Sequence, residues 1–161
     1  MDTLEIDRIL SKSNITSGVY KGTFPADKLP LIQEYPSAVI ANNHVARLKG
    51  EHWVTFWFDS QGNGEFFDSF GESPDFFHSD DKFETYLENN SVNWDYNEKC
   101  IQSLFSLSCG QHAIYYVVMR SLGYSMAELL KPFGKDYDHN DRIVEGFVEK
   151  YFGYSPKFKI W

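Results

Sequence analysis

Cysteine is scarce in this sequence: Cys100 and Cys109 are the only two in 161 residues. Two cysteines exclude the disulfide framework of a small secreted domain, so we expect an intracellular, reducing setting. The nine-residue spacing also lacks the short Cys-x-x-Cys pattern of a zinc site, and no metal is expected. Cys109, just before Gly110, could still be a buried filler, half of a disulfide or a nucleophile.

Long hydrophobic runs are missing as well. None approaches the roughly 20 residues that span a bilayer. The first stretch, MDTLEIDRIL, is acidic and amphipathic, which does not fit a secretory signal. We therefore expect no membrane partner.

The sequence has no excess of positive charge. It holds 15 Lys and Arg against 23 Asp and Glu, a net charge of −8. Nucleic-acid binding normally needs a basic face, so a nucleic-acid partner is not expected. There is also no Gly-rich phosphate loop. The carboxylates are distributed along the whole chain, and we interpret them as solvated surface residues.

Aromatic residues are abundant, at 17% of a chain that is 42% hydrophobic. This is enough for a sizeable core without metal or disulfide staples. Repeats, low-complexity segments and linkers are absent, so we expect a single domain over residues 1–161.

The hydrophobic pattern predicts an α+β domain with one mainly antiparallel central sheet. Leu4, Ile6, Ile9 and Leu10 are expected on one stripe of the first helix. The last helix has N-cap candidates from Asp138 to Asp141 and a stop at Gly153. The expected elements are helix 3–12, strand 37–41, hairpin 51–71, helix 79–90, strand 91–97 and helices 109–122, 125–132 and 138–153.

Cys109 is expected at the N-terminus of a helix. There the unpaired backbone N–H groups and the positive end of the helix dipole favour thiolate over thiol. Gly110 would let a substrate approach the sulfur closely. The position suits a nucleophile, although a lone cysteine is more often a buried apolar residue.

A cysteine nucleophile needs a base, and the base needs an orienting group. Of the five histidines, His52 begins the strongest predicted strand. If the hairpin turns near Gln61, Val54 lies opposite Asp68, and His52 is the diagonal neighbour of Asp68 on the same face. Asp68 would then hold one ring nitrogen of His52 and leave the other for the thiol. A register slip of one residue would separate the pair.

The other histidines fit this role less well. His112 lies one helical turn after Cys109, but no carboxylate is in place to orient it, so a packed or surface histidine is expected. His78 is expected in a loop, and His139, in DYDHND, at a helix cap rather than in a metal cluster.

An oxyanion also needs donors. The backbone N–H of Cys109 is one candidate, and the side-chain amide of Gln102, seven residues upstream, is the other. Taken alone, Gln102 would be an ordinary surface glutamine. Cys100 is interpreted as structural or incidental.

These residues together resemble the adenovirus-type cysteine proteases (the adenain family) and their relatives in Maverick/Polinton-like elements, distant kin of the SUMO proteases. The matching stretches are GEHWVTFWFD, GEFFDSFG and QSLFSLSCGQHAIYYV. The shared order is His-Trp on a strand, an acidic residue before a Phe-Gly turn, then Gln, then Cys-Gly at the start of a helix. The resemblance covers roughly residues 18–122, and it implies an adenain-like fold with the nucleophile at the N-terminus of a central helix.

By this resemblance Cys109 is the nucleophile, His52 the general base and Asp68 its orienting group, with Gln102 and the Cys109 amide as the oxyanion hole. Trp53 would pack beside the histidine and, with Gly110, contact the substrate. The implied reaction is peptide-bond hydrolysis through a thioester. The expected substrates are glycine-containing sites in viral or virus-like structural proteins, such as capsid and core precursors.

The resemblance is incomplete. Adenovirus enzymes carry Glu where this chain has Asp68, and they are activated by DNA and by a peptide that forms a disulfide. Cys100 does not align well with that disulfide, and the net charge argues against activation by DNA. We therefore expect that no cofactor is required, although a peptide activator stays possible. The protein is expected to be a monomer. If the protein is viral, it is expected in the virion, the host nucleus or the virus factory. The rival readings are a ubiquitin-like deconjugating protease and a catalytically silent peptide-binding module.

Overall fold

The computed structural model describes residues 1–44, 46, 52–77 and 82–154. Its centre is a five-stranded sheet with the strands in sequence order. The strands are β1 (Tyr20–Pro25), β2 (Ser37–Asn42), β3 (Trp53–Phe58), β4 (Asn63–Phe67) and β5 (Asn93–Tyr96). The helices are α1 (Thr3–Lys12), α2 (Lys82–Asn90), α3 (Cys109–Ser121), α4 (Met126–Leu130) and α5 (Tyr137–Phe152), with a short 3-10 turn η1 (Pro74–Phe76).

The α+β class is confirmed, but the sheet is mixed rather than mainly antiparallel. The central pairs β2–β3 and β3–β4 are antiparallel, whereas both outer pairs, β1–β2 and β4–β5, are parallel. Parallel neighbours need a crossover connection, and α2 supplies it between β4 and β5. Strand β1 was not predicted, because Gly22 and Pro25 gave its segment the appearance of a loop.

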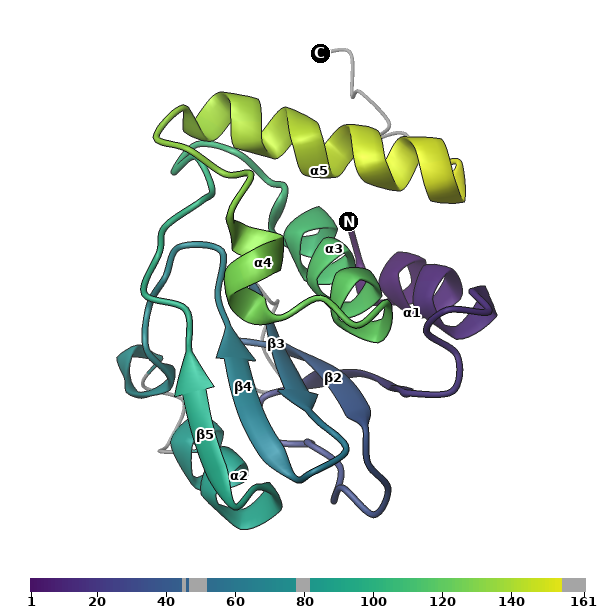
Figure 1. The fold of residues 1–161 in the computed structure, drawn as a ribbon, viewed down its shortest axis with the longest axis vertical. Coiled ribbons are helices and arrows are strands. Elements are labelled where there is room, and N and C mark those ends of the chain that lie inside the picture. The colour runs from purple at the N-terminus through teal and green to yellow at the C-terminus, as the bar shows by residue number, and fades with distance from the viewer. Residues whose placement is uncertain (45, 47–51, 78–81, 155–161) are drawn as a thin grey trace.

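Alternation along the strands gives the sheet two apolar faces. On one face, Ala38, Ile40, Trp57 and Phe67 pack with the apolar sides of α1, α3, α4 and α5. On the other, Val39, Ala41, Val54, Phe56, Phe58 and Phe66 pack with α2. Figure 1 shows α3 lying between the sheet and α5. Helix α3 is therefore buried on almost all sides from Cys109 to Val118, and its N-terminus is held from several directions.

Several predicted boundaries need correction. Leu4 is exposed at 77%, so the buried stripe of α1 is narrower than expected and includes Ile6 and Leu10. Helix α5 begins at Tyr137 rather than Asp138, because the carboxylate of Asp136 accepts the backbone N–H of His139 and caps it. Its predicted stop is confirmed, since Gly153 adopts a left-handed conformation with φ 65°. Residues 79–81 of the helix expected at 79–90, and His78, lie outside the described residues.

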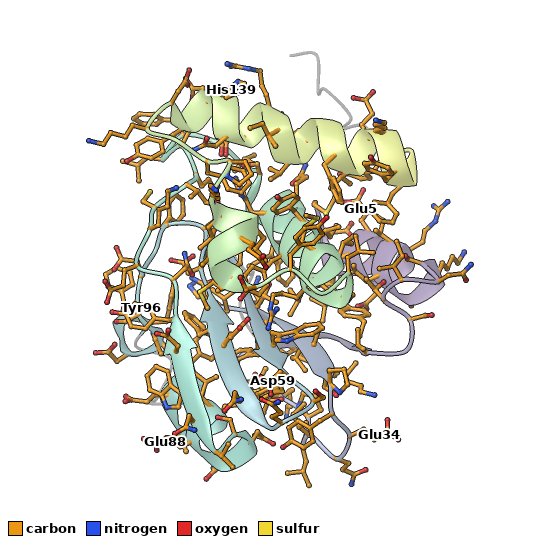
Figure 2. All side chains as sticks on the ribbon, viewed as in Figure 1. Glu5, Glu34, Asp59, Glu88, Tyr96 and His139 are labelled. Carbon is orange, nitrogen blue, oxygen red and sulfur yellow. The ribbon has the colours of Figure 1, made fainter. Side chains whose placement is uncertain are left out.

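The carboxylates are spread over the molecule. Figure 2 shows Glu5, Glu34, Asp59 and Glu88 at widely separated places. In the part of the chain that the structure describes, no helix is long and apolar enough to cross a bilayer.

Candidate active site

The β3–β4 hairpin has the register that the sequence predicts. Thr55 pairs with Phe67 and Phe56 with Phe66, so Val54 falls opposite Asp68. His52 immediately precedes β3, and its backbone exchanges hydrogen bonds with Asn43, at 3.0 Å to the side chain and 3.1 Å to the backbone N–H. The contacts with Asn43 hold the start of β3 beside the end of β2.

Cys109 is the first residue of α3 and is 9% exposed. Burial alone would raise the pKa of its thiol. The hydrogen bond and positive charge of His52 oppose that effect, and the backbone N–H groups of Trp53 and Gly110 add to them, so that the pKa falls below its ordinary value. The surroundings therefore favour a thiolate.

His52 lies between Asp68 and Cys109. Its Nε2 hydrogen-bonds to Oδ1 of Asp68, which leaves Nδ1 for the sulfur. Burial would lower the pKa of His52, but the hydrogen bonds and charges of Asp68 and Cys109 raise it to about 9. The ring also stacks on Phe70 and Phe77, with centroids 5.0 and 6.0 Å away. At neutral pH this arrangement favours an imidazolium–thiolate ion pair.

Asp68 is fully buried at the end of β4, and both of its oxygens accept hydrogen bonds. Oδ1 bonds to His52, and Oδ2 accepts the backbone N–H of Glu72 at 3.0 Å. Asn97 holds the backbone of Asp68 from both sides, at 2.9 and 2.7 Å. Asn97 was not predicted as a site residue.

The Phe-Gly turn after Asp68 has a structural reason. Gly71 has φ +75°, and a Cβ there would lie 2.8 Å from the backbone of Lys99 and Cys100. Any larger residue would push the turn away from the segment that leads to Gln102.

Gln102 lies in this neighbourhood and is 1% exposed. Its Oε1 accepts a hydrogen bond from the hydroxyl of Ser69, and its Nε2 lies 3.2 Å from both the carbonyl oxygen and the hydroxyl of Ser106. The amide is thus fixed in position, and its donors face Ser106.

Trp53 and Gly110, the two predicted substrate-contact residues, both lie against Met1. The indole Nε1 of Trp53 donates to the carbonyl oxygen of Met1 at 3.3 Å. A Cβ at Gly110 would lie 3.0 Å from Cβ of Met1 and 3.1 Å from its sulfur. In this structure Met1 therefore occupies the space that the missing Cβ of Gly110 leaves free.

The expectation that no carboxylate orients His112 is wrong. His112 is fully buried, and its Nε2 lies 2.9 Å from Oδ1 of Asp141 on α5. Burial lowers the pKa of His112 more than Asp141 raises it, so the ring is neutral at neutral pH. The sequence predicts Asp141 only as one of the helix-cap candidates, and its contact with His112 is a correction to that. The available signal was its place on the buried stripe of α5 with Val144 and Val148.

Cys100 has different surroundings from Cys109. It is partly exposed, its thiol donates to the carbonyl oxygen of Gln102 at 3.6 Å, and burial together with nearby carboxylates raises its pKa. His139 is exposed in the first turn of α5 (Figure 2). Within the described ranges, no cluster of His, Cys, Asp and Glu has the arrangement of a metal site.

Comparison with known proteins identifies the fold. No family model matches the sequence, and no curated protein matches it. Among solved structures, the chain is similar to the ASFV pS273R protease, with a TM-score of 0.55 at 16% identity over 89% of this chain and 66% of that one. It is also similar to the central domain of the uncharacterized Lpg1148 protein from Legionella pneumophila, with a TM-score of 0.51 at 13% identity over 93% and 95% of the two chains. The fold thus resembles that of a viral cysteine protease, and the chain spans about two thirds of its length.

Proposed function

We propose that this protein is a cysteine endopeptidase of adenovirus type that matures viral or virus-like structural precursors. The observation that carries the proposal is the grouping of Cys109, His52 and Asp68: His52 hydrogen-bonds to the buried Asp68, and the pKa of His52 is raised while that of the Cys109 thiol is lowered. A thiolate at a helix N-terminus, paired with an imidazolium that a buried carboxylate orients, is the arrangement that acyl transfer to sulfur requires. The likeness in fold to a viral protease supports the same reading.

In the proposed reaction, the Cys109 thiolate attacks the carbonyl carbon of the scissile peptide bond. The negative charge that forms on the carbonyl oxygen is stabilised by the Cys109 backbone N–H and by Gln102. Because both donors of the Gln102 amide face Ser106, we propose that the oxyanion replaces one of these contacts.

His52 then donates its proton to the leaving amine, and a thioester with Cys109 remains. Water attacks the thioester carbonyl and gives its proton to His52, and collapse of the second oxyanion releases the carboxylate product and the Cys109 thiolate. Asp68 keeps Nδ1 of His52 directed at the sulfur through both steps.

A glycine-containing peptide library with mass-spectrometric readout tests the proposal. Wild type and Cys100→Ala should cleave the same peptides, and Cys109→Ala should cleave none. Binding of peptides without cleavage, by a wild type whose Cys109 is freely alkylated, would instead indicate a silent binding module. Labelling of Cys109 by a ubiquitin-like vinyl sulfone, without cleavage of the library, would indicate a deconjugating protease.

A further inference from the structure

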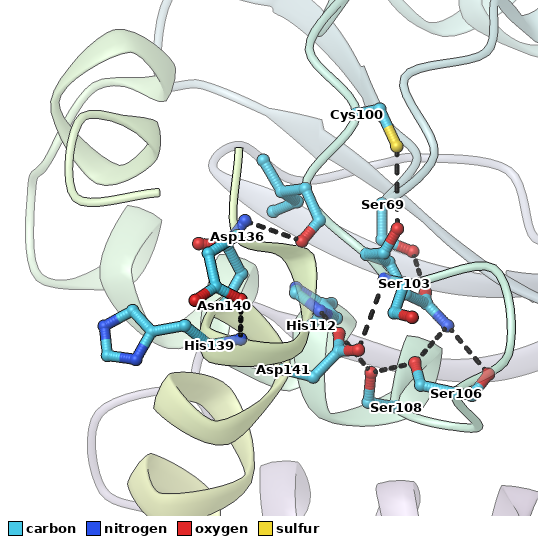
Figure 3. A network of polar contacts seen from close by, with 12 residues as sticks. Ser69, Cys100, Ser103, Ser106, Ser108, His112, Asp136, His139, Asn140 and Asp141 are labelled. Carbon is cyan, nitrogen blue, oxygen red and sulfur yellow. Dashed lines mark hydrogen bonds and ion pairs between the residues drawn. The ribbon is translucent and has the colours of Figure 1, made fainter. Parts of the chain in front are cut away.

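Asp141 on α5 contacts three residues on the two sides of the candidate nucleophile, two before Cys109 and one after it (Figure 3). Oδ1 accepts the hydroxyl of Ser108 at 2.8 Å and Nε2 of His112 at 2.9 Å, while Oδ2 accepts the backbone N–H of Ser103 at 3.2 Å. Asp141 is 5% exposed. Burial would raise its pKa, but the hydrogen bonds from His112, Ser108 and Ser106 lower it, so the side chain is a carboxylate at neutral pH.

The segment between Gln102 and Cys109 has an unusual pattern of burial. Leu104, Phe105 and Leu107 are 79, 96 and 86% exposed. Apolar packing therefore does not fix this loop. Its conformation depends on the serines that alternate with these residues, and on the groups to which they bind.

A chain of hydrogen bonds links Asp141 to Gln102. The hydroxyl of Ser108 lies 2.9 Å from that of Ser106, and Ser106 in turn contacts the Gln102 amide at 3.2 Å. Gln102 then contacts Ser69, the residue after Asp68. Since Ser108 directly precedes Cys109, both proposed oxyanion donors are tied to one carboxylate.

His112 does not form a second catalytic pair. Its ring is fully buried, and its Nδ1 has no hydrogen-bond partner among the described residues. A neutral ring with the proton on Nε2 fits these surroundings, because that proton can bond to Asp141. His112 thus helps to keep Asp141 charged and in place beside the first turn of α3.

We propose that Asp141 is a positioning residue for the oxyanion hole. Through Ser103, Ser108 and Ser106 it sets the loop of residues 102–108 so that the Gln102 amide and the Cys109 N–H converge on one point. This inference rests on the proposed peptidase activity. It concerns the stabilisation of the oxyanion and not the ionisation of the thiol, which depends on His52.

Two reactions of Cys109 separate these roles. Alkylation by iodoacetamide needs the thiolate but forms no oxyanion, whereas peptide hydrolysis needs both. Asp141→Asn keeps the size of the side chain but places an amide N–H against groups that are themselves donors. We expect kcat for a cleaved library peptide to fall about 10- to 100-fold, less than the 10²–10³-fold typical for removal of an oxyanion donor. KM and the alkylation rate of Cys109 should stay within about twofold, since neither depends on the oxyanion.

Asp138→Asn is the matched control: it makes the same change one turn earlier on α5, at an exposed position, and should leave both rates unchanged. Ser108→Ala removes one hydrogen bond to Asp141, and it replaces Asp141→Asn in this test if that variant does not fold. It should reduce kcat by a smaller factor, again without loss of alkylation.

Unchanged hydrolysis in both Asp141→Asn and Ser108→Ala would overturn the inference. An equal loss of hydrolysis and of alkylation in the folded variants would also overturn it. Asp141 would then stabilise the fold or the His52–Cys109 ion pair and not the oxyanion hole in particular. Failure of the proposed function gives a different result, because the wild type itself would then hydrolyse no peptide.

Discussion

The described residues include two buried histidine–carboxylate pairs, His52–Asp68 and His112–Asp141. Each histidine is buried and offers Nε2 to a carboxylate. Their pKa values nevertheless shift in opposite directions: the pKa of His52 is raised to about 9, and that of His112 is lowered. One difference is at the second ring nitrogen, which in His52 is left for the Cys109 sulfur and in His112 has no hydrogen-bond partner in the described part of the chain.

A carboxylate partner is therefore not enough to make a histidine a charged acid. For His112 the cost of burial exceeds the benefit of one carboxylate, and the ring stays neutral. For His52 the hydrogen bonds and charges of Asp68 and Cys109 together exceed the cost of burial. The same pair of groups thus forms a charged acid in the proposed reaction at His52 and a neutral, structural contact at His112.

The largest effect is expected from His52→Ala, which removes both the base and the cation beside Cys109. Hydrolysis should fall by about 10⁴-fold or more, as for the base of a catalytic triad. The measurement is kcat/KM with a cleaved library peptide. Retention of more than about a tenth of the activity would contradict the assignment, since a tenfold loss is only about 1.4 kcal/mol of barrier.

Asp68→Asn should have the next largest effect, because a neutral amide neither stabilises the imidazolium nor fixes which nitrogen faces the sulfur. We expect kcat to fall by up to about 10⁴-fold, as for the orienting carboxylate of a catalytic triad. An equal loss in Asp95→Asn, an exposed carboxylate on β5, would show that the effect is not specific to the pair.

His112 should make stability depend on pH in a defined direction. Its pKa is lowered in the folded chain, so between pH 6.5 and its folded pKa the unfolded chain binds more protons, and stability falls as pH falls. The contribution of His112 should lower the free energy of unfolding in urea as pH falls from 6.5 to 5.5, by no more than the limit of about 1.4 kcal/mol per pH unit for one group. His112→Gln should remove this part of the slope, and the exposed His139→Gln should leave it. The same slope in all three proteins would disprove the account of His112.

The smallest effect is expected at Cys100. Its thiol is partly exposed, has a raised pKa and bonds only weakly to the Gln102 carbonyl. Cys100→Ser should change kcat/KM by less than about twofold, in line with a surface substitution. A loss of tenfold or more would show that Cys100 takes part in positioning Gln102.

The hairpin and the His52–Asp68 approach were predictable because local rules determine them. Alternating aromatic and β-branched residues define the two faces of β3, and the Gln61–Gly62 turn fixes the register. The N-terminus of α3 was predictable for the same reason. In each case the information lies within a few residues of the element.

The features that were missed depend on contacts distant in the sequence. Strand β1 forms because β2 offers it a parallel edge, against the local preference of Gly22 and Pro25. Asp141 meets His112 across 29 residues, and Asn97 meets Asp68 across the same separation. Polar residues on a buried helical stripe, such as Asp141, show that a partner must exist but not which residue it is.

The most direct test of the central claim, that His52 keeps Cys109 as a thiolate, is the rate of iodoacetamide labelling at each cysteine as a function of pH. In the wild type, Cys109 should react rapidly at about pH 6, far below the ordinary thiol pKa of about 8.5, while Cys100 should react only at alkaline pH. In His52→Ala the fast reaction should disappear at Cys109 and leave Cys100 unchanged. If both cysteines instead react slowly and gain reactivity together above about pH 8.5, the ion pair does not exist and the proposed mechanism is wrong.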